Sequence, residues 1–416
     1  MDRRSFTATV LGVAASPLVP RIARSADPLR IGLGMAQTGP LAANGKSALI
    51  AMDIWREEVN GKGGVLGRPV EFVIYDDQSN PSTVPGIYTK LLDVDKVDLV
   101  VSGYGTNVIA PAMPVVIQHN RTFLSLFGLA VNEQFHYPRY FTITPTGPDP
   151  TVSSTVGFFE VGAAQNPAPK TLAIVAADAE YPRASAEGVR KNAKKFNWDI
   201  VYDKNYPPNT TDYSPIIRAV QATNPDAVFV ASYPLDSVGI VHAANEVGLK
   251  TKLFGGGMVG LQTTSVKEQL GPLMNGIVNY DFWIPAKTMQ FPGVMDFLKK
   301  YQDKAANSGV DPLGYYLAPW AYTYMQVLAD SVEGAKGLDQ DKIADWMRSH
   351  TFKTVMGDIA FGEDGELSVS HSMMVQFQHV TGNGIDQFNT GAQPVILWPA
   401  KYKDGDALYP YDSART

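Results

Sequence analysis

The sequence predicts an α/β protein built from two doubly wound parallel-sheet lobes. Three observations support this: short β-rich runs alternate with longer amphipathic stretches from residue 29 onward, the same rhythm restarts at residue 171, and a proline- and glycine-rich segment at 144–150 lies between the two series. Strands that alternate with helices form parallel sheets covered on both faces. A chain of 416 residues is also long enough for two domains.

Each expected element follows from local patterning. Residues 45–59 carry apolar side chains at the spacing of one buried helix face, whereas residues 98–102 form a short apolar run typical of a buried strand. In the first series we expect strands over 29–35, 70–75, 98–102 and 121–126, and helices over 45–59, 84–93 and up to 120. In the second series we expect strands over 171–176, 199–202, 227–231 and 252–254, and helices over 184–196, 213–222 and 238–247. The last third adds helices over 292–306, 319–334 and 340–348 and a β-like segment, so later returns of the chain should complete both cores.

Composition excludes several classes of function. The formal net charge is −6 and there is no basic stripe, so the electrostatic footprint of a nucleic-acid binder is missing. The sequence contains no cysteine, which excludes disulfides, thiolate nucleophiles, cysteine-ligated metals and an acylated-cysteine anchor.

The N-terminus has the order of an export signal. Arg3 and Arg4 precede an apolar run at residues 7–15, and small residues around Ala26 suit cleavage. The paired arginines favour a twin-arginine signal over residues 1–26, with an ordinary secretory signal as the alternative. No later segment approaches ~20 uninterrupted apolar residues, so no membrane span is expected.

The candidate catalytic motifs in the sequence do not have the residue spacing that catalysis requires. The glycine-rich loop at 39–47 has five residues between its glycines instead of four, and Pro40 removes a backbone N–H, so it is not a phosphate-binding loop. The six histidines show no zinc-protease spacing, and no nucleophile elbow occurs. We expect Asp76 and Asp77 to cap a turn rather than to hold a metal or act as an acid–base pair. The sequence therefore predicts a protein that is not an enzyme and has no metal or cofactor.

Polar and aromatic residues follow several of the predicted strands. Ligands of open α/β sheets bind at the carboxyl ends of the strands, where loops meet helix N-termini. Thr106 stands at such a point and suits a carboxylate, through its hydroxyl and the unpaired amides of the helix start. Tyr104, Tyr181 and Tyr233 follow other strand ends and offer flat apolar walls with polar tips.

At these residues the sequence resembles the leucine/isoleucine/valine-binding branch of the type I periplasmic solute-binding proteins. The matching segments are residues 38–42 (TGPLA) with Gly45, 60–67 (NGKGGVLG), 75–81 (YDDQSNP) and 246–250 (EVGLK). The resemblance implies two lobes, joined by three crossovers, that close on a ligand and then dock on the membrane permease of an ABC importer. It also implies a monomer in the periplasm, with a first lobe at 27–146 and 282–355 and a second at 147–281 and 356–416.

The resemblance also assigns binding residues. The hydroxyl that holds the ligand carboxylate falls on Thr106, with backbone contacts nearby, and the aromatics of the far lobe fall on Tyr181 and Tyr233. Asn44 stands where some members of the family have an aromatic residue that lines the pocket. The acidic residue that meets an amino acid's ammonium falls on Gly257. The complete set of expected ligand contacts is Asn44, Tyr104, Thr106, Phe127, Gly128, Leu129, Ala130, Tyr181, Tyr233, Gly257, Met258 and Phe282.

Gly257 stands where the resemblance implies an acidic residue, and this difference decides which ligand we expect. A buried ammonium without a counter-charge costs several kcal/mol, so we expect a small carboxylate without an α-amino group, such as an aromatic acid. In the alternative, Glu180 or Asp236 takes over the ammonium, and the ligand is a branched-chain amino acid or a small amide. Alternatives of another class are a hydrolase in the same cleft and a ligand-sensing regulatory module. Further stacking surfaces are expected from Trp283, Tyr315 and Tyr316.

Overall fold

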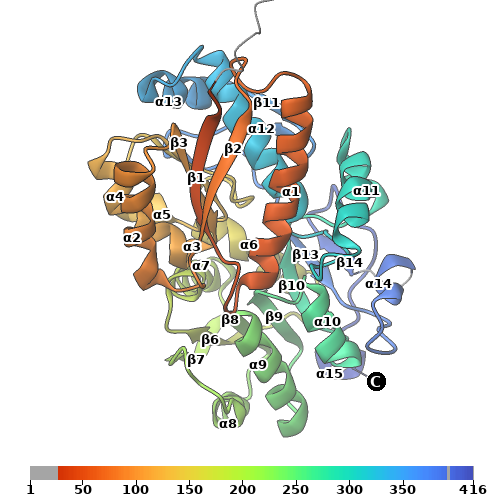
Figure 1. Cartoon of the computed structure of the whole chain (residues 1–416). Coiled ribbons are helices and arrows are strands. Elements are labelled where there is room, and N and C mark those ends of the chain that lie inside the picture. Colours follow the sequence, from red (N-terminus) through yellow and green to blue (C-terminus); the bar gives the residue numbers. More distant parts are fainter. Residues whose placement is uncertain (1–26, 391–393, 416) are drawn as a thin grey trace, which may run out of the picture.

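The computed structural model describes residues 27–390 and 394–415, and the predicted export signal at 1–26 lies outside them. The described chain folds around two open sheets that are covered by helices (Figure 1). This arrangement confirms the predicted α/β class with two sheet-centred halves.

The first sheet has five parallel strands in the order β2-β1-β3-β4-β5. Its central strand is buried along its whole length, as its mostly apolar sequence predicts. The three-residue strand β5 (Tyr140–Thr142) was not predicted, because three residues are too few to show a pattern. The strands are β1 (Leu29–Met35), β2 (Val70–Asp76), β3 (Leu99–Tyr104), β4 (Phe123–Leu126) and β5 (Tyr140–Thr142).

Helices from distant parts of the chain cover this sheet. On one face α1 (Ala42–Gly61) packs against α12 (Ala318–Gly334) and α11 (Val294–Ala305), so a late return of the chain completes the core, as expected. The Tyr324 hydroxyl of α12 lies 3.0 Å from the carbonyl oxygens of both Ser102 and Leu124, which ties the helix to neighbouring strands. The other helices of this half are α2 (Val84–Thr89), α3 (Thr106–Ile109), α4 (Met113–Gln118), α5 (Val131–Phe135) and α13 (Gln340–Ser349).

The second sheet has seven strands in the order β14-β13-β10-β9-β8-β6-β7. Its first five strands in sequence are parallel, and two late strands extend one edge, β13 pairing antiparallel with β10 and β14 antiparallel with β13. The strands are β6 (Thr171–Ala177), β7 (Asp199–Tyr206), β8 (Ala227–Ser232), β9 (Leu253–Met258), β10 (Val278–Asp281), β13 (Met373–Gln376) and β14 (Val395–Trp398). The helices of this half are α6 (Pro150–Ala163), α7 (Glu180–Phe196), α8 (Ser214–Ala222), α9 (Pro234–Val247), α10 (Thr264–Leu270), α14 (Asp386–Thr390) and α15 (Tyr411–Ala414).

Helix α6 was not predicted. It packs against α7 and several strands and is buried on more than one side, so its sequence lacks a single apolar stripe. Pro150 at its first position is nevertheless typical of a helix start, because proline needs no N–H partner there.

The strand predicted over 252–254 extends further than expected, into the glycine run after Phe254. Strand β9 continues through Gly255, Gly256 and Gly257. Gly256 has φ +101°, and a Cβ atom there would lie 2.3 Å from the ring of Phe229. The glycines therefore allow an aromatic ring of the neighbouring strand to pack directly on the backbone of β9.

The chain crosses between the two sheets three times, at residues 143–149, 282–293 and 360–372. The first and third crossovers touch, because the His371 amide donates to the Pro145 carbonyl at 2.9 Å. The short hairpin of β11 (Phe352–Thr354) and β12 (Gly357–Ile359) precedes a loop whose Gly365 carbonyl accepts from the Thr142 amide of β5. The predicted lobe boundary at residue 355 stays a prediction, and these contacts favour one nearer residue 366.

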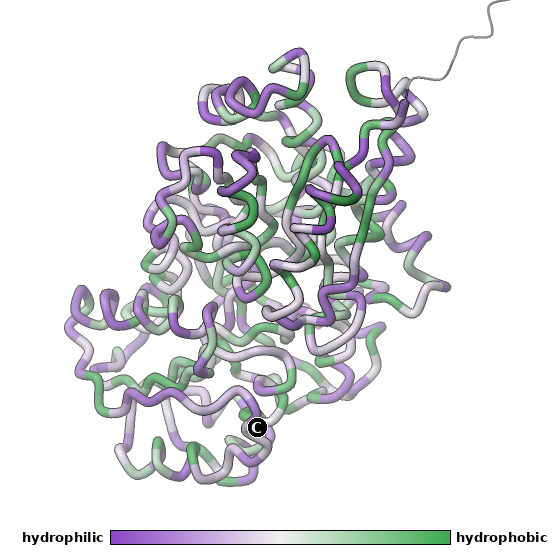
Figure 2. Tube along the Cα trace, turned by 60° about the vertical axis from the view of Figure 1, so that its left-hand side comes forward, coloured by the Kyte–Doolittle hydropathy of each residue, from purple (hydrophilic) through white to green (hydrophobic). Residues whose placement is uncertain are grey.

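Hydrophobic residues, green in Figure 2, are frequent along the inner segments, whereas hydrophilic residues are frequent along the outer coils and loops. The strands of both sheets supply many of the buried hydrophobic residues. Within residues 27–390 and 394–415, no helix is long and apolar enough to cross a membrane.

Candidate ligand-binding site

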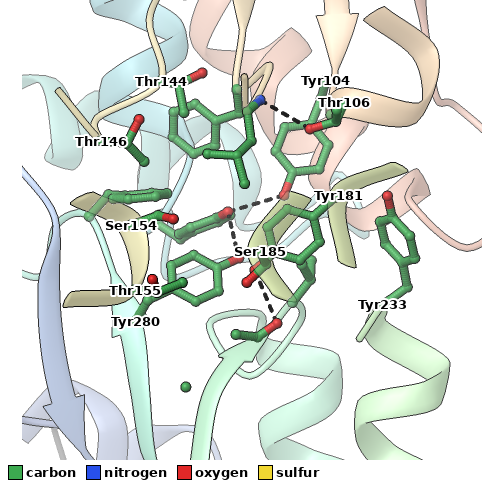
Figure 3. A pocket seen from close by; sticks show the side chains of 18 of the residues that line it. Tyr104, Thr106, Thr144, Thr146, Ser154, Thr155, Tyr181, Ser185, Tyr233 and Tyr280 are labelled. Carbon is green, nitrogen blue, oxygen red and sulfur yellow. Dashed lines mark hydrogen bonds between the residues drawn. The ribbon is translucent and has the colours of Figure 1, made fainter. Parts of the chain in front are cut away.

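An inner cavity of about 50 Å³ lies where the carboxyl ends of strands from both sheets meet (Figure 3). This is the position that open parallel sheets favour for ligands. A cavity of this size holds a few water molecules and is smaller than the roughly 150 Å³ that accommodates benzene, so a ring-sized ligand requires its walls to separate. The lining residues are Tyr104, Gly105, Thr106, Phe127, Leu129, Thr144, Thr146, Ser154, Thr155, Tyr181, Ser185, Phe229, Tyr233, Gly256, Gly257, Val259, Tyr280, Phe282 and Tyr316.

Thr106 is held in place by the loop that follows β4. The Leu129 amide donates to Thr106 Oγ1 at 3.1 Å, and the threonine is buried. Two non-glycine residues of that loop, Phe127 and Ala130, have φ of +64° and +54°. Such left-handed conformations cost of order 1 kcal/mol each and cluster at functional sites. Since the hydroxyl oxygen accepts from Leu129, its hydrogen remains available to an acceptor in the cavity.

Three tyrosine hydroxyls form a chain between Tyr104 and Tyr280, which are labelled in Figure 3. The hydroxyls of Tyr104 and Tyr316 lie 3.2 Å apart, and those of Tyr280 and Tyr316 lie 3.1 Å apart. Nearby, the Tyr181 hydroxyl donates to the Gly257 carbonyl at 3.0 Å. Burial raises the pKa of each of these four phenols well above its ordinary value, so all four stay neutral at physiological pH.

Aromatic rings make up much of the wall. Phe282 stacks on Tyr316 with ring centroids 5.8 Å apart, and Phe127 meets Phe282 edge-on at 5.0 Å. Such pairs stabilise a wall beyond the area they bury. They also present flat apolar faces against which a planar ligand would pack.

Short hydroxyl side chains form the opposite wall, and sequence reasoning missed them. Thr146 belongs to the first crossover, and its Oγ1 is buried without a hydrogen-bond partner in the described chain. Thr155 accepts from Asn192 at 2.9 Å. The available signal was the run of polar residues at the start of α6, on a helix that is otherwise mostly apolar. The missed short hydroxyl side chains are Thr144, Thr146, Ser154, Thr155 and Ser185, and the phenol of Tyr280 in the tyrosine chain was missed as well.

None of the residues that line the inner cavity, all within the described ranges, carries a charge. Gly257 lines it, and a Cβ atom there would lie 3.1 Å from the ring of Phe229, so the phenylalanine takes the space beside this position. Asp236 accepts hydrogen bonds from Tyr206 and Tyr213, at 3.1 and 2.9 Å, and with Glu180 it lines a different, outer space. The two acids considered as alternative ammonium partners are therefore not at the inner cavity.

The structure brings most of the expected contact residues together, but not all. Asn44 lies at a separate cavity of about 10 Å³ beside Asp311. Gly128 packs near the Tyr140 hydroxyl, Ala130 precedes α5, and the Met258 amide donates to Asn279. The expected residues that line the inner cavity are Tyr104, Thr106, Phe127, Leu129, Tyr181, Tyr233, Gly257 and Phe282. Of the further stacking candidates Tyr316 lines it, whereas Trp283 and Tyr315 are not among the lining residues.

An outer cleft of about 780 Å³ opens beside the inner cavity. Among the described residues, Tyr233 alone lines both spaces. Its hydroxyl, on the second-sheet side, donates to Asn107 Oδ1, on the first-sheet side. Tyr233 therefore separates the inner cavity from the outer cleft, and its hydrogen bond to Asn107 links the two halves.

The acidic pair Asp76 and Asp77, at the end of β2, organises loops, as predicted. Asp76 accepts from the Gln37 amide at 2.9 Å and from the Thr38 hydroxyl at 2.7 Å, and Asp77 accepts from the Ser79 amide at 2.8 Å. No group of three or more His, Asp or Glu side chains in the described ranges is placed to hold a metal ion.

Comparisons with known proteins agree with this architecture. The family model of the periplasmic binding proteins matches residues 28–382. The Leu/Ile/Val/Thr/Ala-binding protein of Pseudomonas aeruginosa is 25% identical over 344 residues, 82% of this chain and 88% of that protein. The Leu/Ile/Val-binding protein of Escherichia coli K12 is 23% identical over 349 residues, 82% of this chain and 89% of that protein.

Two solved structures show the same fold. A Streptococcus pneumoniae branched-chain amino acid transporter substrate-binding protein, in complex with isoleucine, has a TM-score of 0.72 at 20% identity, covering 86% of this chain and 97% of that one. An ABC-transporter solute-binding protein of R. palustris, in complex with 4-hydroxybenzoate, has a TM-score of 0.73 at 19% identity, covering 86% and 94%. The chain therefore belongs to the periplasmic binding protein family, as a type I solute-binding protein of the ABC-transporter group related to the Leu/Ile/Val-binding proteins.

Proposed function

We propose that this protein captures a small carboxylate without an α-amino group, in the form of an aromatic acid, for an ABC importer. The single observation that carries the proposal is that aromatic rings and hydroxyls line the inner cavity while charged side chains do not. An amino acid's ammonium would be buried there without a counter-charge, at a cost of several kcal/mol. A planar acid would pack between the rings.

In this proposal the carboxylate is held by hydroxyl donors. Thr106 supplies its free hydrogen, and Thr146 supplies a hydroxyl that otherwise lacks a partner. Hydrogen bonds to a charged acceptor are stronger than those between neutral groups. These donors therefore offset part of the cost of removing the carboxylate from water.

Binding then works as a shift between open and closed arrangements of the two halves. Moving such an equilibrium from 1:99 to 99:1 requires about 5.5 kcal/mol of differential affinity, which contacts formed only on closure must supply. Tyr104 and Thr106 come from the first half, whereas Tyr181 and Tyr233 come from the second. The closed protein would then dock, as a monomer, on a membrane permease in the periplasm, after export by the predicted twin-arginine signal.

A second candidate is a branched-chain amino acid, since the relatives named above bind leucine, isoleucine and valine by name. Calorimetric titration of the purified protein with benzoate, 4-hydroxybenzoate, leucine and leucinamide separates the candidates. Saturable binding of an aromatic acid, with leucine at least 100-fold weaker, supports the proposal. Tighter binding of leucine would overturn it. Mass spectrometry of the recovered ligand shows whether it is returned chemically unchanged.

A further inference from the structure

The tyrosine chain in the inner cavity has hydrogen-bonding capacity that it does not use itself. Tyr104, Tyr316 and Tyr280 are buried, and two hydrogen bonds join their three hydroxyls. Each phenol donates one hydrogen and also accepts at its oxygen. Two bonds among three phenols leave one donor and several acceptor positions unused within the trio. All three residues line the cavity, so this capacity is available to a ligand.

The trio also joins the two halves of the molecule. Tyr104 ends β3 of the first sheet and Tyr280 lies in β10 of the second, while Tyr316 precedes Leu317, the N-cap of α12. Since burial raises their pKa values, the hydroxyls keep their protons. The chain is therefore complete only when the halves approach each other, as closure on a ligand requires.

The trio is displaced from the hydroxyl that we assign to the carboxylate. In Figure 3, Thr106 lies beside the Leu129 amide, and the hydroxyl chain runs from Tyr104 toward Tyr280, away from Thr106. One small ligand that occupies both places needs an oxygen at each end.

We propose that the Tyr104–Tyr316–Tyr280 hydroxyl chain recognises a hydroxyl on the ligand opposite its carboxylate, and so selects para-hydroxylated aromatic acids over unsubstituted ones. The inference rests on the proposed function and deepens it. A ligand hydroxyl both donates and accepts, which matches the capacity left in the trio. An acid without that oxygen would leave this remaining capacity unfilled in a buried site, which is costly.

The test measures dissociation constants of benzoate, 2-hydroxybenzoate and 4-hydroxybenzoate by calorimetry, for the wild type, Tyr316→Phe and the triple variant Tyr104→Phe/Tyr280→Phe/Tyr316→Phe. We expect the wild type to bind 4-hydroxybenzoate on the order of 10-fold more tightly than benzoate, and 2-hydroxybenzoate to gain little because its hydroxyl adjoins the carboxylate. The preference for 4-hydroxybenzoate over benzoate should shrink in Tyr316→Phe and fall below about 2-fold in the triple variant.

Tyr88→Phe is the matched control, because its buried hydroxyl bonds the Val101 carbonyl outside the cavity, and it should keep the full preference. If the triple variant does not fold, Tyr104→Phe and Tyr280→Phe replace it, and at least one must reduce the preference. Equal binding of benzoate and 4-hydroxybenzoate by the wild type, or equal losses for both acids in the variants, would overturn this inference and leave the proposed function standing. Failure of every aromatic acid to bind overturns both.

Discussion

Individual side chains carry the recognition that we propose, and Thr106 is the residue whose replacement tests it most simply. Its position after a buried strand made it predictable, because a hydroxyl at a strand end of an open sheet is a recurrent ligand contact. Thr146 and Ser185 were not predictable in this way. The first belongs to a crossover and the second to the interior of α7, and only the folded arrangement brings them to the cavity.

Replacing Thr106 with alanine should weaken binding of the aromatic acid by about 1–3 kcal/mol, the usual cost of leaving a charged group without its hydrogen bond. Thr106→Ser keeps the hydroxyl and should lose less than about 0.5 kcal/mol. Calorimetry with the acid identified by the ligand panel measures both. Unchanged affinity in the alanine variant would remove Thr106 from the site.

Asp77 should make stability depend on pH. Burial raises the pKa of its carboxyl to about 6, with the Asp76 charge acting in the same direction and the Ser79 amide opposing it. The folded state then holds this proton more tightly than the unfolded state, whose carboxyl titrates near 4. The contribution to the free energy of unfolding therefore falls as pH rises from about 4 to about 6, by roughly 2 kcal/mol.

Asp77→Asn keeps an acceptor for the Ser79 amide but cannot ionise. The variant should gain stability relative to the wild type, by about 2 kcal/mol, when the pH is raised from 4.5 to 7.5. Urea unfolding at the two pH values measures the difference. A constant difference between variant and wild type would show that the carboxyl titrates alike in both states.

At the scale of elements, the carboxyl ends of the strands in each sheet position the site. Buried runs such as β3 and β8 were predictable because both faces of a parallel sheet are covered. Strand β10 and helix α6 were not, since a four-residue strand and a helix buried on several sides show no clear period. Strand β9 runs through its glycines because Phe229 needs the space that side chains would occupy.

Gly256→Ala should destabilise the fold by more than backbone strain alone. The residue has φ +101°, and the new methyl group would meet the Phe229 ring at 2.3 Å. Gly63 has a similar φ of +105° but no atom within 4 Å of its Cβ position, so Gly63→Ala isolates the strain. In denaturant unfolding, the free energy of unfolding of Gly256→Ala should be about 1–3 kcal/mol lower than that of Gly63→Ala. Equal losses would mean that the Phe229 contact is unimportant.

At the scale of the molecule, three crossovers join the two halves around the inner cavity, and the Tyr233 hydroxyl donates to Asn107 at its outer side. The two-lobed architecture followed from the repeated strand–helix rhythm and from the matched segments. The partition by Tyr233 did not, because it depends on how the halves approach each other.

Tyr233→Phe should release ligand faster, because the hydrogen bond to Asn107 would be lost from the closed state. A net contribution of about 1 kcal/mol corresponds to a roughly 5-fold higher dissociation rate, measured by stopped-flow fluorescence. Asn107→Ala removes the same bond, so the double variant should release ligand no faster than the single variants. Additive effects on the rate would argue against a shared bond.

A crystal structure of the protein with its bound aromatic acid tests the proposed recognition most directly. The carboxylate should lie within about 3 Å of Thr106 Oγ1, with the ring between Phe282 and the aromatic side chains of the second half. Ligand density confined to the outer cleft, or a bound amino acid whose ammonium meets Glu180 or Asp236, would contradict it.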